Sequence, residues 1–252
     1  MHQIKVLARK ANISLESEIG VSILEVDYSN VNALAKVLEQ NSIDTVISAM
    51  NTLPSASESS EINLIYAASA SNCTRRFVPR KTGAFPTKKK FTVFYNGFFL
   101  DYYGIPSIQT YLPPSVAMVD LAYNTSTIPG SSDTPVVFTH TTDVAKYVAA
   151  SLELEKWDEE GYRLLKALPP LGTKFNVVYD SIEKLRSGTV TELPSHAAAF
   201  AYMPKDVFLG LFSATELLFA DDSFDLKPET TMNEKFPKIK PFKVKDVLTP
   251  HP

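Results

Sequence analysis

The stretch Val21–Met50, VSILEVDYSNVNALAKVLEQNSIDTVISAM, decides the fold class. Its two ends, Val21–Val26 and Thr45–Met50, are short apolar runs typical of buried strands. Between them, apolar residues recur at i, i+3, i+4 and i+7, the spacing of one helix face: Val31, Leu34, Ala35 and Leu38. The stretch therefore predicts a strand, a helix and a second strand.

The same alternation continues on both sides of this stretch. Ile4–Ala8 is another strand-like run, Glu61–Ser71 has helical spacing, and Arg76–Pro79 predicts a fourth strand. Strands and helices that alternate at this spacing indicate right-handed βαβ units and a parallel sheet. A barrel of eight such units would need the whole chain. We therefore expect an α/β fold with a doubly wound parallel sheet.

The regular alternation fails between Arg80 and Lys90. The segment RKTGAFPTKKK is too short for a crossover helix, whereas a parallel connection needs a dozen or more residues. Either the strand at Phe91 joins the sheet differently, or a helix is missing.

An aromatic stretch, Phe91–Gly104 (FTVFYNGFFLDYYG), follows this break. Its alternating start predicts a strand that breaks at the turn-forming pair Asn96-Gly97. Seven aromatic side chains fall within fourteen residues, a load that a core or a ligand pocket absorbs. Open α/β sheets bind ligands where strands end, so both alternatives stay open.

The rest of the chain predicts shorter elements. They are strands at Val116–Ala122, Val136–Thr139 and Lys174–Tyr179, a turn at Ile128–Thr134, helices at Thr141–Glu155, Ser181–Arg186 and Val207–Phe219, and a proline- and lysine-rich tail at Phe236–Pro252.

Composition excludes several classes of protein. A net charge of −3 over 252 residues gives no electrostatic reason to expect direct binding to nucleic acid or to an anionic membrane. No apolar run is long enough to span a bilayer, and the N-terminus lacks the features of a signal peptide. With Cys73 alone, no intrachain disulfide can form. We expect a cytoplasmic protein.

A nucleotide site would normally carry a glycine-rich loop after the first strand, but the nine glycines include no G-x-G pair. Arg9 and Lys10, at the end of a strand, could bind a ribose 2′-phosphate and so favour NADP, or could be two surface cations. Asp27, after the next strand, could contact the adenine or cap the following helix.

Other catalytic patterns are missing from the sequence. The four histidines are scattered, so no metal site is expected, and no G-x-S-x-G elbow indicates a hydrolase. His140 lies between a strand and a helix, where it could face a cleft or serve the structure. Cys73 is expected to be a half-buried core residue.

Several blocks follow one another along the chain, among them VDYSNVNALAKVL, DTVISAM, FTVFYNGFFLDYYGIP and IPGSSDTPVVFTHTTDVAKYVAASLELEKW. In this order they resemble the NmrA-like and isoflavone-reductase-like family of atypical short-chain dehydrogenases, in particular its fungal members. The resemblance implies a Rossmann-like NAD(P)-binding domain at 1–140. It also implies a mixed region at 141–252 that completes the sheet and forms a smaller C-terminal substrate lobe. Some members are reductases, whereas NmrA-type members sense the nicotinamide redox state and regulate a transcription factor.

The chain departs from the family pattern at three places. It starts at what corresponds to the family's second strand, so the first strand and the glycine-rich loop are expected to be missing. A helix carrying the lysine of the reductases normally precedes FTVFYNGFF, and none of Lys88, Lys89 or Lys90 can be assigned as that lysine. The segment Trp157–Gly172 is also shorter. These losses suggest an aberrant gene model, a splice form or a decaying paralogue.

The resemblance leads to one main hypothesis and two alternatives. The main one is an NADP(H)-dependent reductase-like protein for a small, aromatic molecule, with cofactor binding weakened or lost and the catalytic residues unassigned. The expected cofactor residues are Arg9, Lys10, Asp27, Asn96 and Gly97, and the expected pocket residues are Tyr95, Phe98, Phe99, Tyr102, Tyr103 and His140. The alternatives are a non-catalytic NADP sensor that binds a transcription regulator, which would place it also in the nucleus, and a pseudoenzyme fragment.

Overall fold

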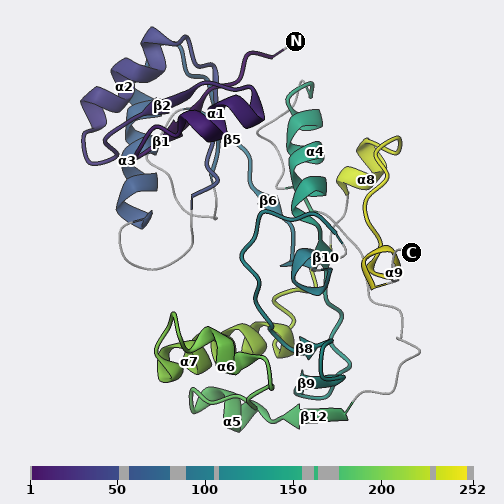
Figure 1. Cartoon of the computed structure of the whole chain (residues 1–252). Helices are drawn as coiled ribbons and strands as arrows, with labels where there is room; N and C mark the ends of the chain where they lie inside the picture. Colours follow the sequence, from purple (N-terminus) through teal and green to yellow (C-terminus); the bar gives the residue numbers. More distant parts are fainter. Residues whose placement is uncertain are drawn as a thin grey trace. The chain divides into compact units, whose positions relative to one another are not determined.

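The chain forms two compact units in a computed structural model that describes residues 2–50, 57–79, 89–104, 108–154, 162–163, 176–227 and 231–248 (Figure 1). Unit 1 comprises Met1–Phe94 with Glu155–Gly161, and unit 2 comprises Tyr95–Leu154 with Tyr162–Pro252. This boundary comes earlier in the chain than the division at residue 140, which stays a prediction about functional domains.

Unit 1 alternates strands and helices, and every strand pair in it is parallel. Its elements are β1 Val6–Ala8, α1 Ile13–Ile19, β2 Ile23–Glu25, α2 Val31–Gln40, β3 Thr45–Ile47, α3 Ser57–Ala70, β4 Arg76–Val78 and β5 Lys90–Phe91. β1 pairs with β2, while β4 pairs with both β3 and β5. The α/β class and the parallel pairing predicted from the sequence are confirmed.

One hydrophobic core serves both of these sheets. The helical face predicted from the sequence is confirmed, because Leu34 and Leu38 of α2 are almost fully buried. They pack with Val46 of β3, Phe77 of β4 and Leu7 of β1. Among the described residues, however, β1 and β3 do not hydrogen-bond to each other.

Helix α1 is not predicted from the sequence. Asn12 caps its start by accepting a hydrogen bond from the N–H of Leu15, and Gly20 ends it in the left-handed conformation at φ 66°. None of its residues is buried. The apolar pattern that reveals a packed helix is therefore lacking here, and only the two caps indicate it.

The strand predicted at the start of the aromatic stretch is not continuous, because its residues form β5 and, separately, β6 Phe94–Tyr95. After Asn96-Gly97, where the sequence predicts a break, come β7 Phe98–Phe99 and a 3-10 helix, η1, at Leu100–Tyr103. β5 joins β4 in parallel although only Pro79–Lys89 connects them. Most of that connection lies outside the described residues.

Unit 2 is a mixed region with short strands and a group of helices. Its further elements are β8 Val119–Asp120, β9 Thr125–Pro129, β10 Phe138–Thr139, α4 Thr141–Ser151, β11 Tyr162–Arg163, β12 Asn176–Asp180, α5 Ile182–Arg186, α6 His196–Ala199, α7 Lys205–Ala220, α8 Met232–Lys235 and α9 Val244–Leu248. β7 pairs with β10 and β9 with β12 in parallel, whereas β8 and β9 are antiparallel.

The turn predicted at Ile128–Thr134 is partly wrong. Ile128 and Pro129 end β9, and the chain turns only at Gly130, whose φ is 64°. Pro129 is tolerated because it is the last residue of the strand. Among the described residues, no helix is both long and apolar enough to cross a membrane.

Candidate functional site

Arg9 lies at the carboxyl end of β1, the end of a parallel strand at which open α/β sheets bind ligands. Its Nη2 donates to the hydroxyl of Ser60 at 3.3 Å, and its guanidinium carbon lies 6.0 Å from the centre of the Tyr28 ring. Within the described part of the chain, no carboxylate pairs with Arg9. Among the residues that the structure describes, the end of β1 therefore carries a cation without a counter-charge.

Tyr28 holds this end of the sheet together. Its hydroxyl donates to the carbonyl of Leu7 at 3.0 Å, and its own carbonyl accepts from the side-chain amide of Asn63 in α3 at 2.9 Å. Burial raises the pKa of the Tyr28 phenol, and the nearby charge of Arg9 opposes this only in part. Tyr28 is therefore a neutral hydrogen-bond donor across the physiological range.

Asp27 and Lys10, the other residues expected here, are both exposed. Asp27 accepts hydrogen bonds from the hydroxyl and the N–H of Ser29 at 2.7 and 2.8 Å, and these bonds lower the pKa of its carboxyl group. Asn30, not Asp27, caps α2 by accepting from the N–H of Ala33. Asp27 thus shapes a turn, and its expected contact with adenine stays a prediction.

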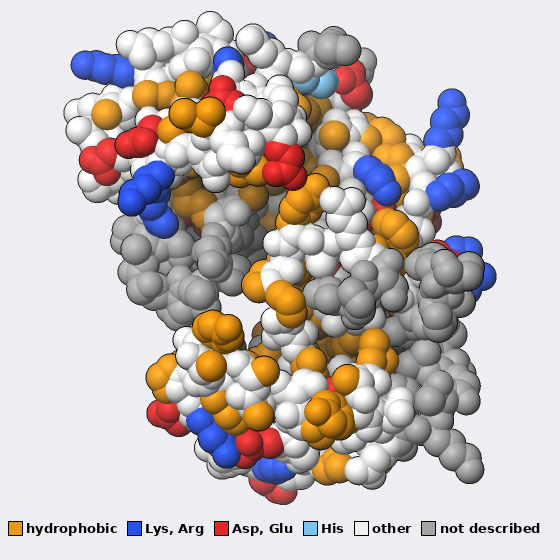
Figure 2. All heavy atoms as spheres, viewed as in Figure 1, with side chains coloured by type: hydrophobic (Ala, Val, Ile, Leu, Met, Phe, Trp, Pro, Cys, Tyr) orange, Lys and Arg blue, Asp and Glu red, His pale blue; other side chains and the backbone are white. Residues whose placement is uncertain are grey.

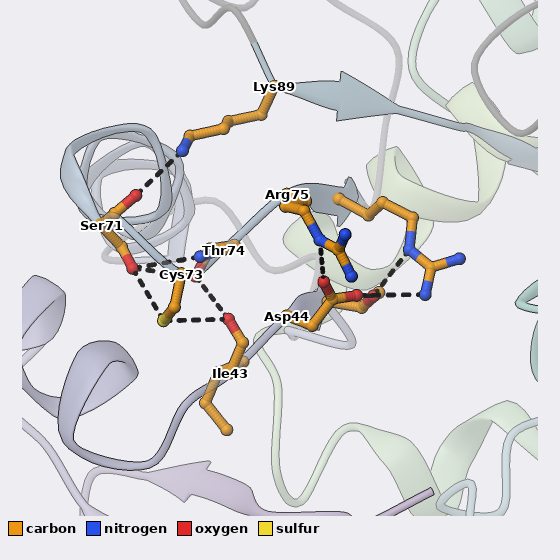
Figure 3. Close-up of polar contacts among 9 residues, drawn as sticks. Ile43, Asp44, Ser71, Cys73, Thr74, Arg75 and Lys89 are labelled. Atoms are coloured by element: carbon orange, nitrogen blue, oxygen red, sulfur yellow. Dashed lines mark hydrogen bonds and ion pairs between the residues drawn. The ribbon is translucent and has the colours of Figure 1, made fainter.

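At the amino ends of β3 and β4, by contrast, arginines are paired with a carboxylate (Figure 3). Arg75 and Arg76 both bind the carboxylate of Asp44, with Nη2 of Arg76 at 3.1 Å. Burial raises the pKa of Asp44, but the hydrogen bonds from Arg75, Thr45 and Arg76 outweigh it and lower the pKa overall. At this end of the sheet, a carboxylate therefore offsets part of the charge of the two arginines.

Cys73 lies near this ion pair, and its thiol contacts a hydroxyl group and backbone carbonyls, as Figure 3 shows in part. Its thiol donates weakly to the carbonyls of Leu38 and Ile43, at 3.4 and 3.5 Å, and lies 3.3 Å from the hydroxyl of Ser71. Lys89 donates to the carbonyl of Ser71 at 2.9 Å. Cys73 is half-buried, which confirms the expectation from the sequence.

In unit 2, Gly97 is required by the pairing of β7 with β10. Its φ is 65°, and a Cβ atom there would lie 2.1 Å from the carbonyl oxygen of Val137. That same carbonyl accepts from the N–H of Phe98 at 2.9 Å. The half-buried side chain of Asn96 donates to the carbonyl of Gly97. The turn is therefore shaped by contact between backbones.

The aromatic residues after this turn mostly pack against one another. The ring of Phe98 lies 5.1 Å from Phe219, 6.1 Å from Phe224 and 5.5 Å from Tyr102, measured between ring centres. Tyr103 is buried, and burial raises the pKa of its phenol strongly, with the charge of Glu216 adding to the effect. The half-buried residues Tyr95, Phe99 and Tyr102 keep part of their surface open to solvent.

His140 is buried and caps α4, whereas the sequence analysis left open whether it faces a cleft or serves the structure. Its Nδ1 accepts from the N–H of Thr142 at 3.2 Å. Its Nε2 lies 3.5 Å from the buried carboxylate of Asp101, which accepts from the N–H and hydroxyl of Thr141 at 2.8 and 2.6 Å. With 1% of its surface exposed, His140 serves the structure in this arrangement.

The described residues contain no cluster of His, Cys, Asp and Glu that could hold a metal ion. The sequence does contain one Tyr-x-x-x-Lys pair, at Tyr162 and Lys166. Tyr162 lies in the short strand β11, and Lys166 lies outside the described residues.

The chain is similar to fungal proteins named as oxidoreductases, although it matches no protein-family model. It is 31% identical over 184 residues to Oxidoreductase BOA1 of Botryotinia fuckeliana, a match covering 64% of this chain and 61% of that relative. The chain therefore spans less than two thirds of the length of that relative. It is 26% identical over 303 residues to Oxidoreductase swnN of Metarhizium robertsii, covering 97% and 88%.

The fold is that of known Rossmann-like reductases. The leucoanthocyanidin reductase–NADPH complex from Vitis vinifera matches with a TM-score of 0.67 at 15% identity, covering 97% of this chain and 89% of that one. The structure named AtPrR2 with NADP+ and (+)pinoresinol matches with a TM-score of 0.64 at 16% identity, covering 98% and 90%. These likenesses confirm the α/β, Rossmann-like fold class.

Proposed function

We propose that the chain binds NADP(H) and is an oxidoreductase-like protein for a small organic molecule. The observation that carries this proposal is the guanidinium of Arg9 at the carboxyl end of β1, which has no carboxylate partner in the described part of the chain. In dinucleotide-binding sheets, an arginine near this edge accommodates the ribose 2′-phosphate of NADP. The oxidoreductase names of the fungal relatives and the NADP(H) complexes among the structural neighbours support the same assignment.

The residues present fit one end of the cofactor. A guanidinium has five N–H donors, of which Arg9 uses one on Ser60, so the others can bind a phosphate. The fit does not extend to the pyrophosphate, because the connection between β1 and α1 contains no glycine that would let backbone amides approach it. A bound nicotinamide would supply hydride chemistry, but the described residues assign no catalytic group to it.

The half-buried aromatic residues of unit 2 support an aromatic or similarly flat substrate. Tyr95, Phe99 and Tyr102 combine an apolar ring with partial exposure, which suits a small apolar ligand. Two of the solved neighbours are named for such molecules, pinoresinol and leucoanthocyanidin.

Titration with NADPH and with NADH tests the cofactor assignment. Arg9→Ala should weaken NADPH binding about 10- to 100-fold and leave NADH binding nearly unchanged, because a hydrogen bond to a charged group contributes about 1.5–3 kcal/mol. Arg75→Ala is the matched control, since it removes an exposed arginine of the same unit that lies at the amino end of β4. Equal losses in the two variants, or no NADPH binding by the unaltered chain, would contradict the proposal.

The second candidate is a redox sensor that binds NADP(H) without turnover and contacts a transcription regulator. What supports it is the resemblance of the sequence to the NmrA-like family, some members of which sense the nicotinamide redox state. NADPH binding without consumption of NADPH across a panel of aromatic ketones and alkenes would support the sensor. Measurable turnover would exclude it.

A further inference from the structure

A lysine-rich strap runs from the last residue of α8 into α9 in unit 2. We define the lysine strap as residues 235–245, KFPKIKPFKVK. Five of the chain's 25 Lys and Arg residues lie within these eleven positions, and all five are exposed: Lys235, Lys238, Lys240, Lys243 and Lys245. Figure 2 shows Lys and Arg side chains gathered over α8 and α9, on the right of the view. Positive charge is therefore concentrated along one stretch of the chain.

The backbone of the lysine strap is held on α4 by buried polar groups. The buried carboxylate of Asp143 accepts from the N–H of Phe242 at 2.7 Å. The hydroxyl of Tyr147 donates to the carbonyl of Ile239 in a long hydrogen bond of 3.5 Å. The strap also contains two prolines, which restrict its backbone. Its lysines therefore project from a backbone that is fixed in place.

The carboxylates nearest in sequence do not pair with the lysines at the centre of the strap. Glu234 and Asp246, which flank the strap, both accept from backbone N–H groups of the same segment. Among the residues that the structure describes, no carboxylate forms an ion pair with Lys238, Lys240 or Lys243. An anionic partner would therefore give each of these three lysines a new ion pair.

The rest of the chain has the opposite charge. The strap and its two flanking carboxylates have a net charge of +3, whereas the whole chain has −3, so the remainder has −6. A broad anionic surface, such as a membrane or a nucleic-acid duplex, would face this negative remainder as well as the strap, and repulsion would oppose its binding. A narrow anionic partner contacts the strap alone and avoids that repulsion.

The arrangement of the strap also favours a peptide over a small anion or a single-stranded nucleic acid. A small ligand is bound where polar groups converge in a concave site, whereas these lysines are spread along the chain. Between them, the half-buried residues Phe236, Ile239 and Phe242 add apolar surface. The Phe242 ring contacts His140, at 4.8 Å between ring centres, and Nζ of Lys146 at 5.4 Å, so it is not a free platform on which a base could stack.

We propose that the lysine strap is a docking surface for a partner protein, which it binds through an extended acidic segment with several Asp or Glu residues and apolar side chains between them. The carboxylates pair with the exposed lysines, and the apolar side chains contact the half-buried residues of the strap. Because the backbone of the strap is already fixed, docking orders little on this side of the interface. Exposed ion pairs are weak and screened by salt, so the complex is transient and salt-sensitive.

Fluorescence anisotropy, measured without any cofactor, tests the proposal independently of NADP(H) binding. The probe is a labelled peptide in which Glu-Asp-Leu is repeated four times, and the control peptide has Gln and Asn in place of Glu and Asp. We expect the probe to bind in about 50 mM NaCl, at least 10-fold more weakly in about 500 mM NaCl, and the control not to bind. No binding of the probe at low salt would overturn the proposal. Tighter binding of phosphatidylserine vesicles or duplex DNA than of the probe would show that the partner is not an acidic peptide.

Two triple variants of equal net charge separate the strap from the charge of the whole chain. The strap variant combines Lys238→Gln, Lys240→Gln and Lys243→Gln. The control variant changes three exposed lysines outside the strap, by Lys36→Gln, Lys90→Gln and Lys205→Gln. Since an exposed ion pair contributes at most a factor of about five, we expect the strap variant to bind the probe at least 10-fold more weakly and the control variant to bind within about 2-fold of the unaltered chain.

The melting temperature distinguishes lost docking from lost folding. All six substituted side chains are exposed, so both variants should melt within a few degrees of the unaltered chain. Equal losses of probe binding in the two variants would refute the site, because binding would then follow the net charge of the chain. Unchanged binding by the strap variant would refute it as well.

Discussion

In unit 2, three buried carboxylates are held in the same way, each by the N–H and the hydroxyl of one residue: Asp101 by Thr141, Asp120 by Ser195 and Asp180 by Thr191. In unit 1, by contrast, Arg9 has no carboxylate partner among the described residues. In the part of unit 1 that the structure describes, β1 and β3 also do not hydrogen-bond to each other.

The difference shows where a charged ligand would gain new partners. A buried polar group that has its partners rigidifies a structure and gains nothing from a ligand. A cation without a carboxylate partner gains hydrogen bonds when an anionic ligand arrives. We therefore expect substitutions at the closely packed and hydrogen-bonded positions of unit 2 to act mainly on stability, and substitution of Arg9 in unit 1 to act mainly on binding.

The strongest test of this contrast is Gly97→Ala in unit 2. The new methyl group would overlap the Val137 backbone, and the positive φ adds strain, so we expect a loss of about 3–5 kcal/mol in unfolding free energy. Gly188→Ala is the control, because Gly188 has φ 79° but nothing within 4 Å of the added carbon. Its loss should be about 1–2 kcal/mol in urea unfolding. Equal losses in the two variants would show that β7 and β10 are not in close contact.

The second test concerns Glu216, a buried carboxylate that differs from the other three. One oxygen accepts from Thr127 at 2.9 Å, and Oε2 has no hydrogen-bond partner. Burial raises the pKa of Glu216 to about 7, an effect that the Thr127 hydrogen bond opposes. A folded-state pKa above the unfolded value means that stability falls as pH rises from about 4.5 to 7.

Glu216→Gln should therefore match the unaltered chain at pH 4.5 and exceed its unfolding free energy by about 3 kcal/mol at pH 8. Amide exchange of α7, compared across this range, measures the difference. Glu183→Gln changes an exposed carboxylate in the same unit and should show no such trend. A constant difference between Glu216→Gln and the unaltered chain at all pH values would contradict the assignment.

The smallest effect is expected for Asp44→Asn in unit 1. The lowered pKa of Asp44 means that its ion pairs stabilise the fold above the unfolded pKa and are lost as pH falls through the folded one. Because the carboxylate is partly exposed, we expect a cost of about 1 kcal/mol at pH 7, smaller in high salt and absent below pH 3. The exposed Asp133 supplies the control, Asp133→Asn. A salt-independent cost would argue against an ion pair.

Much of unit 1 could be predicted from the sequence because its elements bury one face each. The spacing of Leu34 and Leu38 identifies α2, and both are buried as expected. α1 escapes prediction because Ile13 and Ile19 stay exposed, so no core imposes a helical pattern on the sequence. In unit 2, the end of β9 could not be predicted, because Pro and Gly, which stand at 129 and 130, are typical of a turn.

For the candidate site, the sequence locates the residues at strand ends but not the residues from distant parts of the chain that contact them. Arg9 is correctly placed after a strand, because strand position is local information. That Phe98 packs on Phe219 and Phe224 could not be predicted, since these rings come from a distant part of the chain. The same holds for His140, whose neighbour Asp101 is set by the pairing of β7 with β10.

The aromatic contacts of Phe98 also affect the order in which the chain can fold during translation. Unit 1 lies almost wholly before residue 95, so its core can form while the rest is still being made. Phe98 emerges soon afterwards, but Phe219 and Phe224 follow only after a delay on the order of ten seconds at ribosomal speed. During that interval Phe98 lacks its native contacts with Phe219 and Phe224. Nascent unit 2 is therefore the segment for which a chaperone that binds aromatic side chains would matter most.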